Sequence, residues 1–65
     1  MTPAQLYKAT WIPHPLPNGT AEEIMEPWTT TTTPRVLTCV KIDEDIFVIA
    51  RDKTGVIREV WKVLV

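Results

Sequence analysis

Few side chains in this sequence of 65 residues could do covalent or metal chemistry. Cys39 and His14 are its single cysteine and its single histidine. A cysteine nucleophile needs a base nearby and an electropositive, partly exposed site. Cys39 instead lies in an apolar run, and His14 lies between two prolines far away along the chain. One cysteine and one histidine also cannot complete the usual four-ligand zinc site. We therefore interpret Cys39 as a small buried hydrophobe.

Carboxylates gather in two stretches that lack the spacing of a catalytic or metal-binding set. The stretch "DED" (43–45) lies near Asp52, but a calcium loop needs more oxygen ligands in a fixed order around a glycine. Glu22, Glu23 and Glu26 suit the first turns of a helix. The chain has no phosphate-cradling glycine loop and no Ser–His–Asp set. We therefore predict a protein that is not an enzyme and has no catalytic, cofactor-binding or metal-binding residues.

The most suggestive short motif is "PHPLP", residues 13–17. Alternate prolines favour a polyproline II helix, which docks into aromatic grooves of partner proteins. A rigid arm packed on the domain's own tryptophans is the competing interpretation. Trp28, between Pro27 and a run of five threonines, is the tryptophan best placed for a contact outside the domain. The candidate partner-binding residues are Pro13, His14, Pro15, Leu16, Pro17 and Trp28.

Charge and hydropathy exclude several classes of protein. Seven Lys and Arg residues against eight Asp and Glu give a net charge of −1, which makes a nucleic-acid partner unfavourable. The N-terminal residues lack the pattern of a signal peptide, and no apolar run approaches the length of a membrane-spanning helix. One unpaired cysteine fits a reducing compartment, so we expect a cytoplasmic protein with no membrane contact.

The two halves of the chain differ in their prolines. All six prolines lie at or before Pro34, and none follows it. The second half is therefore free to form continuous β-ladders. We predict a single small domain over 1–65, with a proline-rich arm, a strand and a short helix in 1–34 and a β-meander in 35–65.

The second half reads as three antiparallel strands. The strands are expected at 35–42, 46–51 and 56–65. "DED" (43–45) forms one turn, with two or three residues in the loop. "DKTG" (52–55) forms the other, where Gly55 can take a positive φ. A helix over 56–65 is the alternative, which the Val and Ile content disfavours. Pairing Asp52 with Val56 places Phe47 opposite Trp61.

The first half is more irregular. Alternation of apolar and polar residues predicts a strand at 5–11, and alternate prolines predict an extended segment at 12–19. Thr20 and Glu23 match a capping box, which predicts a short helix at 21–26 ended by Pro27. The threonines at 29–33 are β-branched, so we expect an extended connector there. The segment "AQLYKAT" (4–10) resembles the opening of SH3 domains, but the chain lacks their acidic loop and paired tryptophans, so no family is assigned.

The expected fold is a β-rich α+β domain. It is a three- to four-stranded antiparallel meander with one short helix, and closure into a small SH3-like barrel is the alternative. A chain this short buries only roughly 60% of its unfolded surface. Five consecutive apolar residues at 46–50 place apolar side chains on both faces of the sheet. We therefore expect a homo-oligomer, most simply a dimer.

The absence of catalytic sets and the surplus of apolar surface favour a small non-catalytic protein-interaction module. It would act as an accessory subunit or as an inhibitor of a partner protein, for example a virus-encoded inhibitor. One alternative is an oligomeric binder, or sponge, of a small charged ligand or nucleotide. Another is a nucleic-acid-binding small β-barrel that uses aromatic side chains and the cations Lys41, Arg51, Arg58 and Lys62.

Overall fold

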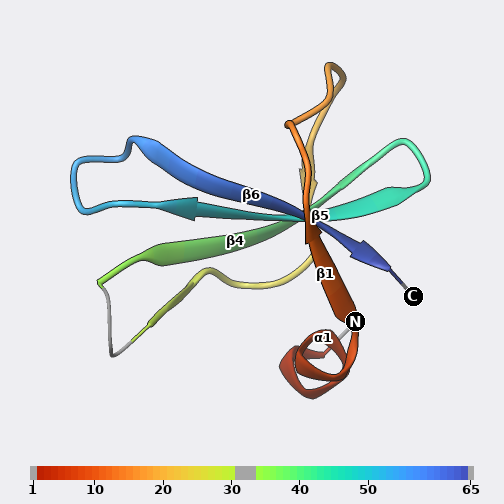
Figure 1. The fold of residues 1–65 in the computed structure, drawn as a ribbon, viewed down its shortest axis with the longest axis horizontal. Helices are drawn as coiled ribbons and strands as arrows, with labels where there is room; N and C mark the ends of the chain where they lie inside the picture. The colour runs from red at the N-terminus through yellow and green to blue at the C-terminus, as the bar shows by residue number, and fades with distance from the viewer. Residues whose placement is uncertain (1, 31–33, 65) are drawn as a thin grey trace.

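The computed structural model describes residues 2–30 and 34–64, which form one antiparallel sheet and one short helix. The elements in chain order are α1 (Pro3–Lys8), β1 (Thr10–Pro13), β2 (Glu22–Glu23), β3 (Trp28–Thr29), β4 (Val36–Ile42), β5 (Asp45–Arg51) and β6 (Ile57–Leu64). The sheet order is β1-β6-β5-β4-β2, and β3 also pairs with β4 (Figure 1). The β-rich architecture with one helix is confirmed. The described residues hold more strands than expected, and the sheet is not closed into a barrel.

The first hairpin of the meander has a two-residue connection. Ile42 pairs with Asp45, so only Asp43 and Glu44 lie between β4 and β5. Asp43 takes the positive φ of 54° that this tight turn requires. The short loop settles the register that the sequence left open, and it places Val40 opposite Phe47.

The second hairpin turns at the predicted place but pairs differently. The N–H of Asp52 donates to the carbonyl of Val56 at 3.0 Å, and Gly55 has a φ of 87°. Beyond the turn, Arg51 pairs with Ile57 whereas Ala50 pairs with Glu59. One residue of β6, Arg58, is therefore extra, which is a β-bulge.

The bulge corrects the expected cross-strand pairs by one position. Phe47 faces Lys62, and Val48 faces Trp61. The predicted pairing of Phe47 with Trp61 is therefore wrong, because it assumed an uninterrupted ladder after the turn.

The predicted strand at 5–11 is wrong over residues 5–8, where the helix lies, while Thr10 and Trp11 do belong to a strand, β1. Thr2 is the N-cap of α1: its hydroxyl accepts from the N–H of Gln5 at 3.2 Å. The Gln5 side chain accepts in return from the N–H of Thr2 at 2.8 Å. This capping box, with Pro3 as the first helical residue, starts the helix. The alternation of apolar and polar residues around Tyr7 had favoured a strand instead.

The predicted helix at 21–26 is a short edge strand instead. Glu22 pairs with Lys41 and Glu23 with Val40, and the N–H of Ile24 donates to the carbonyl of Cys39 at 3.1 Å. These bonds fill the edge of β4, which would otherwise expose unpaired backbone groups. Tertiary pairing therefore outweighs the local capping signal of residues 20–23.

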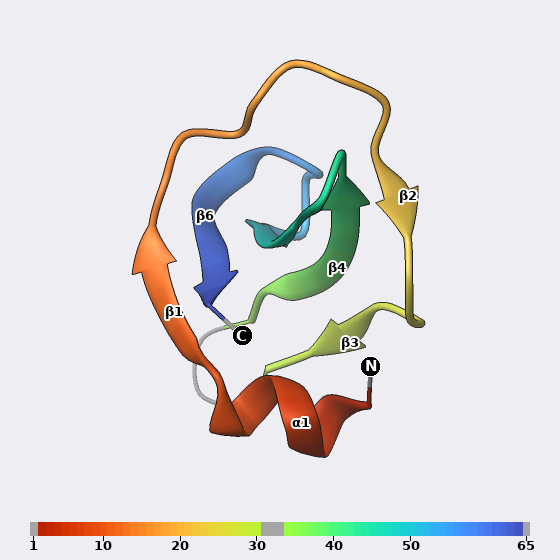
Figure 2. The ribbon, with the colours of Figure 1, turned by 90° about the vertical axis from the view of Figure 1, so that its right-hand side faces the viewer.

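Both faces of the sheet carry a buried cluster. The face toward α1 buries Leu6, Leu37, Cys39, Val48, Ala50 and Val63. The opposite face buries Val40, Ile42, Phe47 and Ile49. In Figure 2, α1 and the segment that joins β1 to β2 lie on opposite sides of the central strands. That segment therefore lies on the second face, where His14 contacts Phe47.

The threonine run is described only in part. Thr29 belongs to β3, and the N–H of Thr30 donates to the carbonyl of Arg35 at 3.1 Å. The expectation of an extended connector at 31–33 falls outside the described residues. Among the residues that the structure describes, no helix is long and apolar enough to cross a membrane.

Candidate binding site

The predicted proline arm packs on the chain's own sheet. The ring of His14 lies 5.6 Å from the ring of Phe47, and the backbone N–H of His14 donates to the carbonyl of Val60 at 3.1 Å. Pro17 is half-buried, while Pro15 and Leu16 are exposed. The arm contacts Phe47, and its first residue, Pro13, pairs with Trp61 of β6.

Pro13 and Trp28 complete the predicted set, and the structure does not bring Trp28 to the arm. Pro13 is exposed at the end of edge strand β1, where it breaks no interior ladder. Trp28 is half-buried against the cluster beneath α1, on the face opposite His14. Its indole nitrogen is buried without a hydrogen-bond partner in the part of the chain that the structure describes.

Tyr7, Trp11 and Trp61 meet at the surface, and the ring of Trp28 lies 6.5 Å from the ring of Tyr7 at an interplanar angle of 74°. Tyr7 of α1 stacks on Trp11 of β1, with ring centroids 6.3 Å apart and an interplanar angle of 20°. Trp11 in turn lies 5.6 Å from Trp61 of β6. The register explains this meeting, because Trp11 pairs with Val63 and therefore projects on the same face as Trp61.

These rings line a hollow of about 310 Å³, which we call the aromatic groove. Arg35 and Glu59 bring charge to the groove, and no ion pair joins them in the described residues. Tyr7 keeps 65% of its surface exposed, so its ring is open to a partner. The groove is lined by Tyr7, Trp11, Thr30, Arg35, Leu37, Ala50, Glu59 and Trp61.

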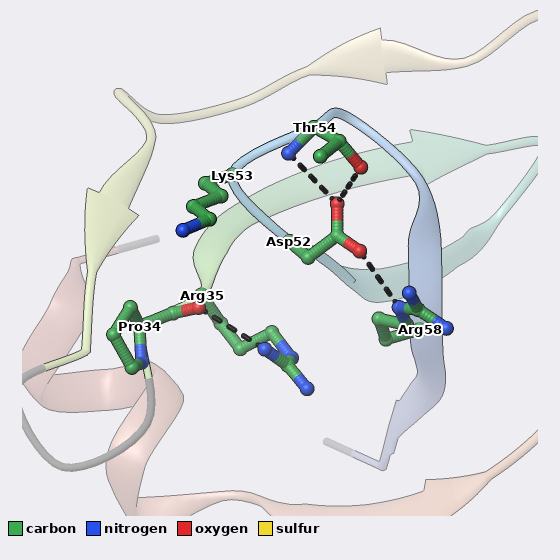
Figure 3. A pocket seen from close by; sticks show the side chains of 6 residues that line it. All are labelled: Pro34, Arg35, Asp52, Lys53, Thr54 and Arg58. Atoms are coloured by element: carbon green, nitrogen blue, oxygen red, sulfur yellow. Dashed lines mark hydrogen bonds and ion pairs between the residues drawn. The ribbon is translucent and has the colours of Figure 1, made fainter.

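A second hollow, of about 430 Å³, lies at the "DKTG" turn, and we call it the basic pocket (Figure 3). Arg35 lines this pocket as well as the aromatic groove. The bulge in β6 supplies Arg58. The lining residues are Pro34, Arg35, Asp52, Lys53, Thr54 and Arg58.

The carboxylate of Asp52 is occupied by its own turn. One oxygen accepts from the hydroxyl of Thr54 and from the backbone N–H groups of Thr54 and Val56, at 2.9 and 3.1 Å for the two N–H groups. The other accepts from Nε of Arg58 at 2.8 Å. The hydroxyl of Thr54 is the main cause that holds the pKa of Asp52 well below its ordinary value. Asp52 therefore anchors the turn.

The cations of the basic pocket are less fully engaged. Arg35 donates through Nη1 to the carbonyl of Pro34 at 3.1 Å, and its buried Nε has no partner in the described ranges 2–30 and 34–64. Lys53 is exposed, and the Arg58 side chain keeps 54% of its surface. Three cations against one carboxylate make this pocket positive on a chain of net charge −1. Such a pocket attracts anions.

Neither hollow is lined by Cys39, by the glutamates at 22, 23 and 26 or by the acidic turn at 43–45. Cys39 is fully buried, and that burial raises the pKa of its thiol, which disfavours the reactive thiolate. The acidic turn at 43–45 lies at the other end of β5 from the basic pocket. Within the described part of the chain, His, Cys, Asp and Glu form no group of three that could hold a metal ion.

Of the residues that line the two hollows, sequence reasoning named only Arg58 as a candidate binding residue, in the nucleic-acid alternative. The capping box at Thr2 and Gln5 would have placed Tyr7 on a helix. No local signal brings Arg35 to Trp61, because Arg35 directly precedes β4, Trp61 lies in β6, and β5 lies between these two strands.

The fold and the site define a class of small protein. Its described residues form an open antiparallel sheet with one helix and two adjoining surface hollows. Comparison of the chain with known proteins gave no matching family model, no matching curated protein and no matching solved structure.

Proposed function

We propose that the chain is a small non-catalytic interaction module that docks a partner protein through the aromatic groove. The observation that carries the proposal is the position of Tyr7, which stacks on Trp11 and stays 65% exposed. Trp, Tyr and Arg are the side chains most enriched at interaction hot spots, and all three types line this groove. A partner's apolar side chain would fill the hollow, with Arg35 at its edge.

This proposal moves the docking surface away from the proline arm. His14 and Phe47 hold the arm on the second face, so the arm is already in use within the chain. Leu16 is exposed on the arm and lies away from the aromatic groove. Bound in this way, the module would act as an accessory subunit or as an inhibitor in the cytoplasm.

Capture experiments with matched variants test the docking surface. The wild-type chain, Tyr7→Ala and Leu16→Ala are used as bait in lysate of the native host, and the retained proteins are identified by mass spectrometry. A protein retained by wild type and Leu16→Ala but lost with Tyr7→Ala supports the groove. The purified partner should then bind in calorimetry with the same order of affinities. If the partner is lost with Leu16→Ala alone, the docking surface is the proline arm and not the aromatic groove.

A second candidate function is the binding of a small charged ligand. The specific observation that favours it is that Arg35 lines both the aromatic groove and the basic pocket. An apolar hollow beside a few convergent polar groups is the usual form of a small-molecule site. The nucleic-acid alternative lacks this support, since Lys41 and Lys62 pair with Ile46 and Phe47, which point to opposite faces of the sheet.

We also propose self-association, through a smaller apolar surface than the whole sheet face that the sequence suggested. The second face buries Phe47 and Ile49 within one chain. Exposed apolar side chains remain at Val36, Val56 and Ile57 near the second hairpin. We expect a dimer through this patch. Light scattering at high protein concentration should give a dimer mass for wild type and Leu16→Lys, and a monomer mass for Ile57→Lys. A monomer mass for wild type would refute the dimer.

A further inference from the structure

We propose that the aromatic groove and the basic pocket form one site for a nucleoside phosphate. The base would stack in the groove and the phosphate would bind in the basic pocket, with Arg35 between them. This inference rests on the second candidate function, the binding of a small charged ligand, and names the class of that ligand.

The groove offers what a planar base needs. The rings of Trp11 and Trp61 lie 5.6 Å apart at an angle of 46°, and the ring of Tyr7 lies 6.3 Å from that of Trp11. Bases stack on such side chains with little dependence on their identity, because every base has a π-face. Glu59 also lines the groove and makes no ion pair in the described part of the chain. Its carboxylate could accept an N–H of a base and would disfavour a phosphate in the groove.

The basic pocket offers what a phosphate needs. Figure 3 shows Arg35, Lys53 and Arg58 around the turn, with Asp52 between Lys53 and Arg58. Arg58 uses Nε to hold Asp52, so its two terminal nitrogens are available. Guanidinium groups bind phosphate oxygens through paired hydrogen bonds. Because the turn and Arg58 occupy the Asp52 carboxylate, its charge opposes an incoming anion less than a free carboxylate would.

Arg35 joins the two halves of the site. Arg35 lines both hollows, and its buried Nε has no partner among the described residues. A buried donor without a partner is unfavourable, so a ligand oxygen would satisfy Nε once the Arg35 side chain turns to expose it. An anion next to a planar group is therefore the ligand chemistry that suits Arg35.

The sizes of the hollows indicate a single nucleotide rather than a strand. Volumes of about 310 and 430 Å³ fall at the small end of the range for ligand pockets. A long polyanion would meet a chain whose net charge is −1. The proposed ligand is therefore a free nucleoside phosphate, and a strand end carries the same chemistry as a second source.

Tryptophan fluorescence and calorimetry with four probes test the site. The probes are a nucleoside, its 5′-monophosphate, inorganic phosphate and a short single-stranded oligonucleotide. We expect the monophosphate to quench tryptophan fluorescence and to bind about tenfold or more tighter than the nucleoside or inorganic phosphate. Equal affinity for inorganic phosphate and monophosphate would overturn the stacking half. Affinity that grows with the length of the oligonucleotide would overturn the single-nucleotide assignment, and no binding of any probe would overturn the whole site.

Three variants separate the two halves of the site from general effects on folding. Lys53→Gln removes an exposed cation of the basic pocket and should weaken monophosphate binding while leaving nucleoside binding unchanged. Tyr7→Leu should weaken both. Lys41→Gln is the matched control, since Lys41 is exposed and lines neither hollow, and it should bind like wild type. Wild-type affinity in both Lys53→Gln and Tyr7→Leu would overturn the assignment.

The nucleotide site and the protein-docking function can fail separately. If no nucleotide binds while Tyr7→Ala still abolishes capture of the partner protein, only the nucleotide site is refuted. If the monophosphate binds as expected and no partner depends on Tyr7, only the docking function is refuted.

Discussion

The indole Nε1 of Trp11 donates a hydrogen bond to the backbone carbonyl of Leu6 at 2.9 Å. The same carbonyl accepts from the N–H of Ala9 at 3.2 Å, and the Leu6 side chain is fully buried. The bond therefore ties the end of α1 to the start of β1. It also sets Trp11 against Tyr7 and so builds one wall of the aromatic groove.

Trp11→Phe should separate this hydrogen bond from the aromatic packing. The variant keeps a ring for Tyr7 but loses the donor, so the free energy of unfolding should fall by about 1 kcal/mol. Trp11→Ala loses the ring as well and should cost several times more. Urea denaturation monitored by circular dichroism measures both. If Trp11→Phe matches wild type, the bond to Leu6 contributes nothing to stability.

Thr2→Ala should destabilise α1, because it removes the capping hydroxyl that accepts from Gln5. The expected cost is about 1 kcal/mol, with a lower melting temperature. Thr20→Ala is the matched control, since Thr20 begins the other capping-box sequence and no helix follows it. It should stay within about 0.5 kcal/mol of wild type. A larger loss in Thr20→Ala than in Thr2→Ala would contradict the helix placement.

Asp52 should give the protein an acid-sensitive hairpin. Its pKa is lower in the folded chain than its ordinary value of 3.8, so the unfolded chain binds the proton more readily. The stabilisation is therefore present above that ordinary value and is lost as the pH falls toward the folded pKa.

Melting temperatures measured as the pH is lowered through 3.8 test this dependence on Asp52. Asp52→Asn should lower the melting temperature at neutral pH and weaken the fall in acid. Glu44→Gln, in the opposite hairpin turn, is the charge-matched control and should leave the neutral melting temperature unchanged. An unchanged acid profile in Asp52→Asn would exclude Asp52 as the source.

Two glycines with positive φ form a matched pair. Gly19 has a φ of 135°, and an added Cβ would lie 3.0 Å from a methyl carbon of Ile42. Gly55 has a φ of 87°, with no atom within 4 Å of an added Cβ. Backbone strain should destabilise both alanine variants by roughly 1–3 kcal/mol. In Gly19→Ala the added Cβ would also push the arm away from Ile42 on the second face. Gly19→Ala should therefore melt lower and bind more hydrophobic dye than Gly55→Ala. The reverse order would show that the arm does not cover Ile42.

The second half of the chain shows how far local pattern reaches. β-branched runs, the absence of proline after Pro34 and the "DKTG" turn predicted β4, β5 and β6 nearly to the residue. These strands are neighbours in sequence joined by tight turns, so local signals specify their order. The bulge at Arg58 was not predicted, because no residue near it indicates an extra position in the strand.

The sequence by itself determined a β-rich fold whose C-terminal half is a meander, since alternation and turn residues act over a few positions. Only the tertiary structure decided the elements of the first half. Residues 22–23 join the sheet because they pair with the edge of β4. The proline arm packs on Phe47 because the second face of the sheet is apolar. Only the tertiary structure also brought Tyr7, Trp61 and Arg35 to one groove. Burial of apolar surface and satisfaction of backbone groups are properties of the whole chain, so no local pattern encodes them.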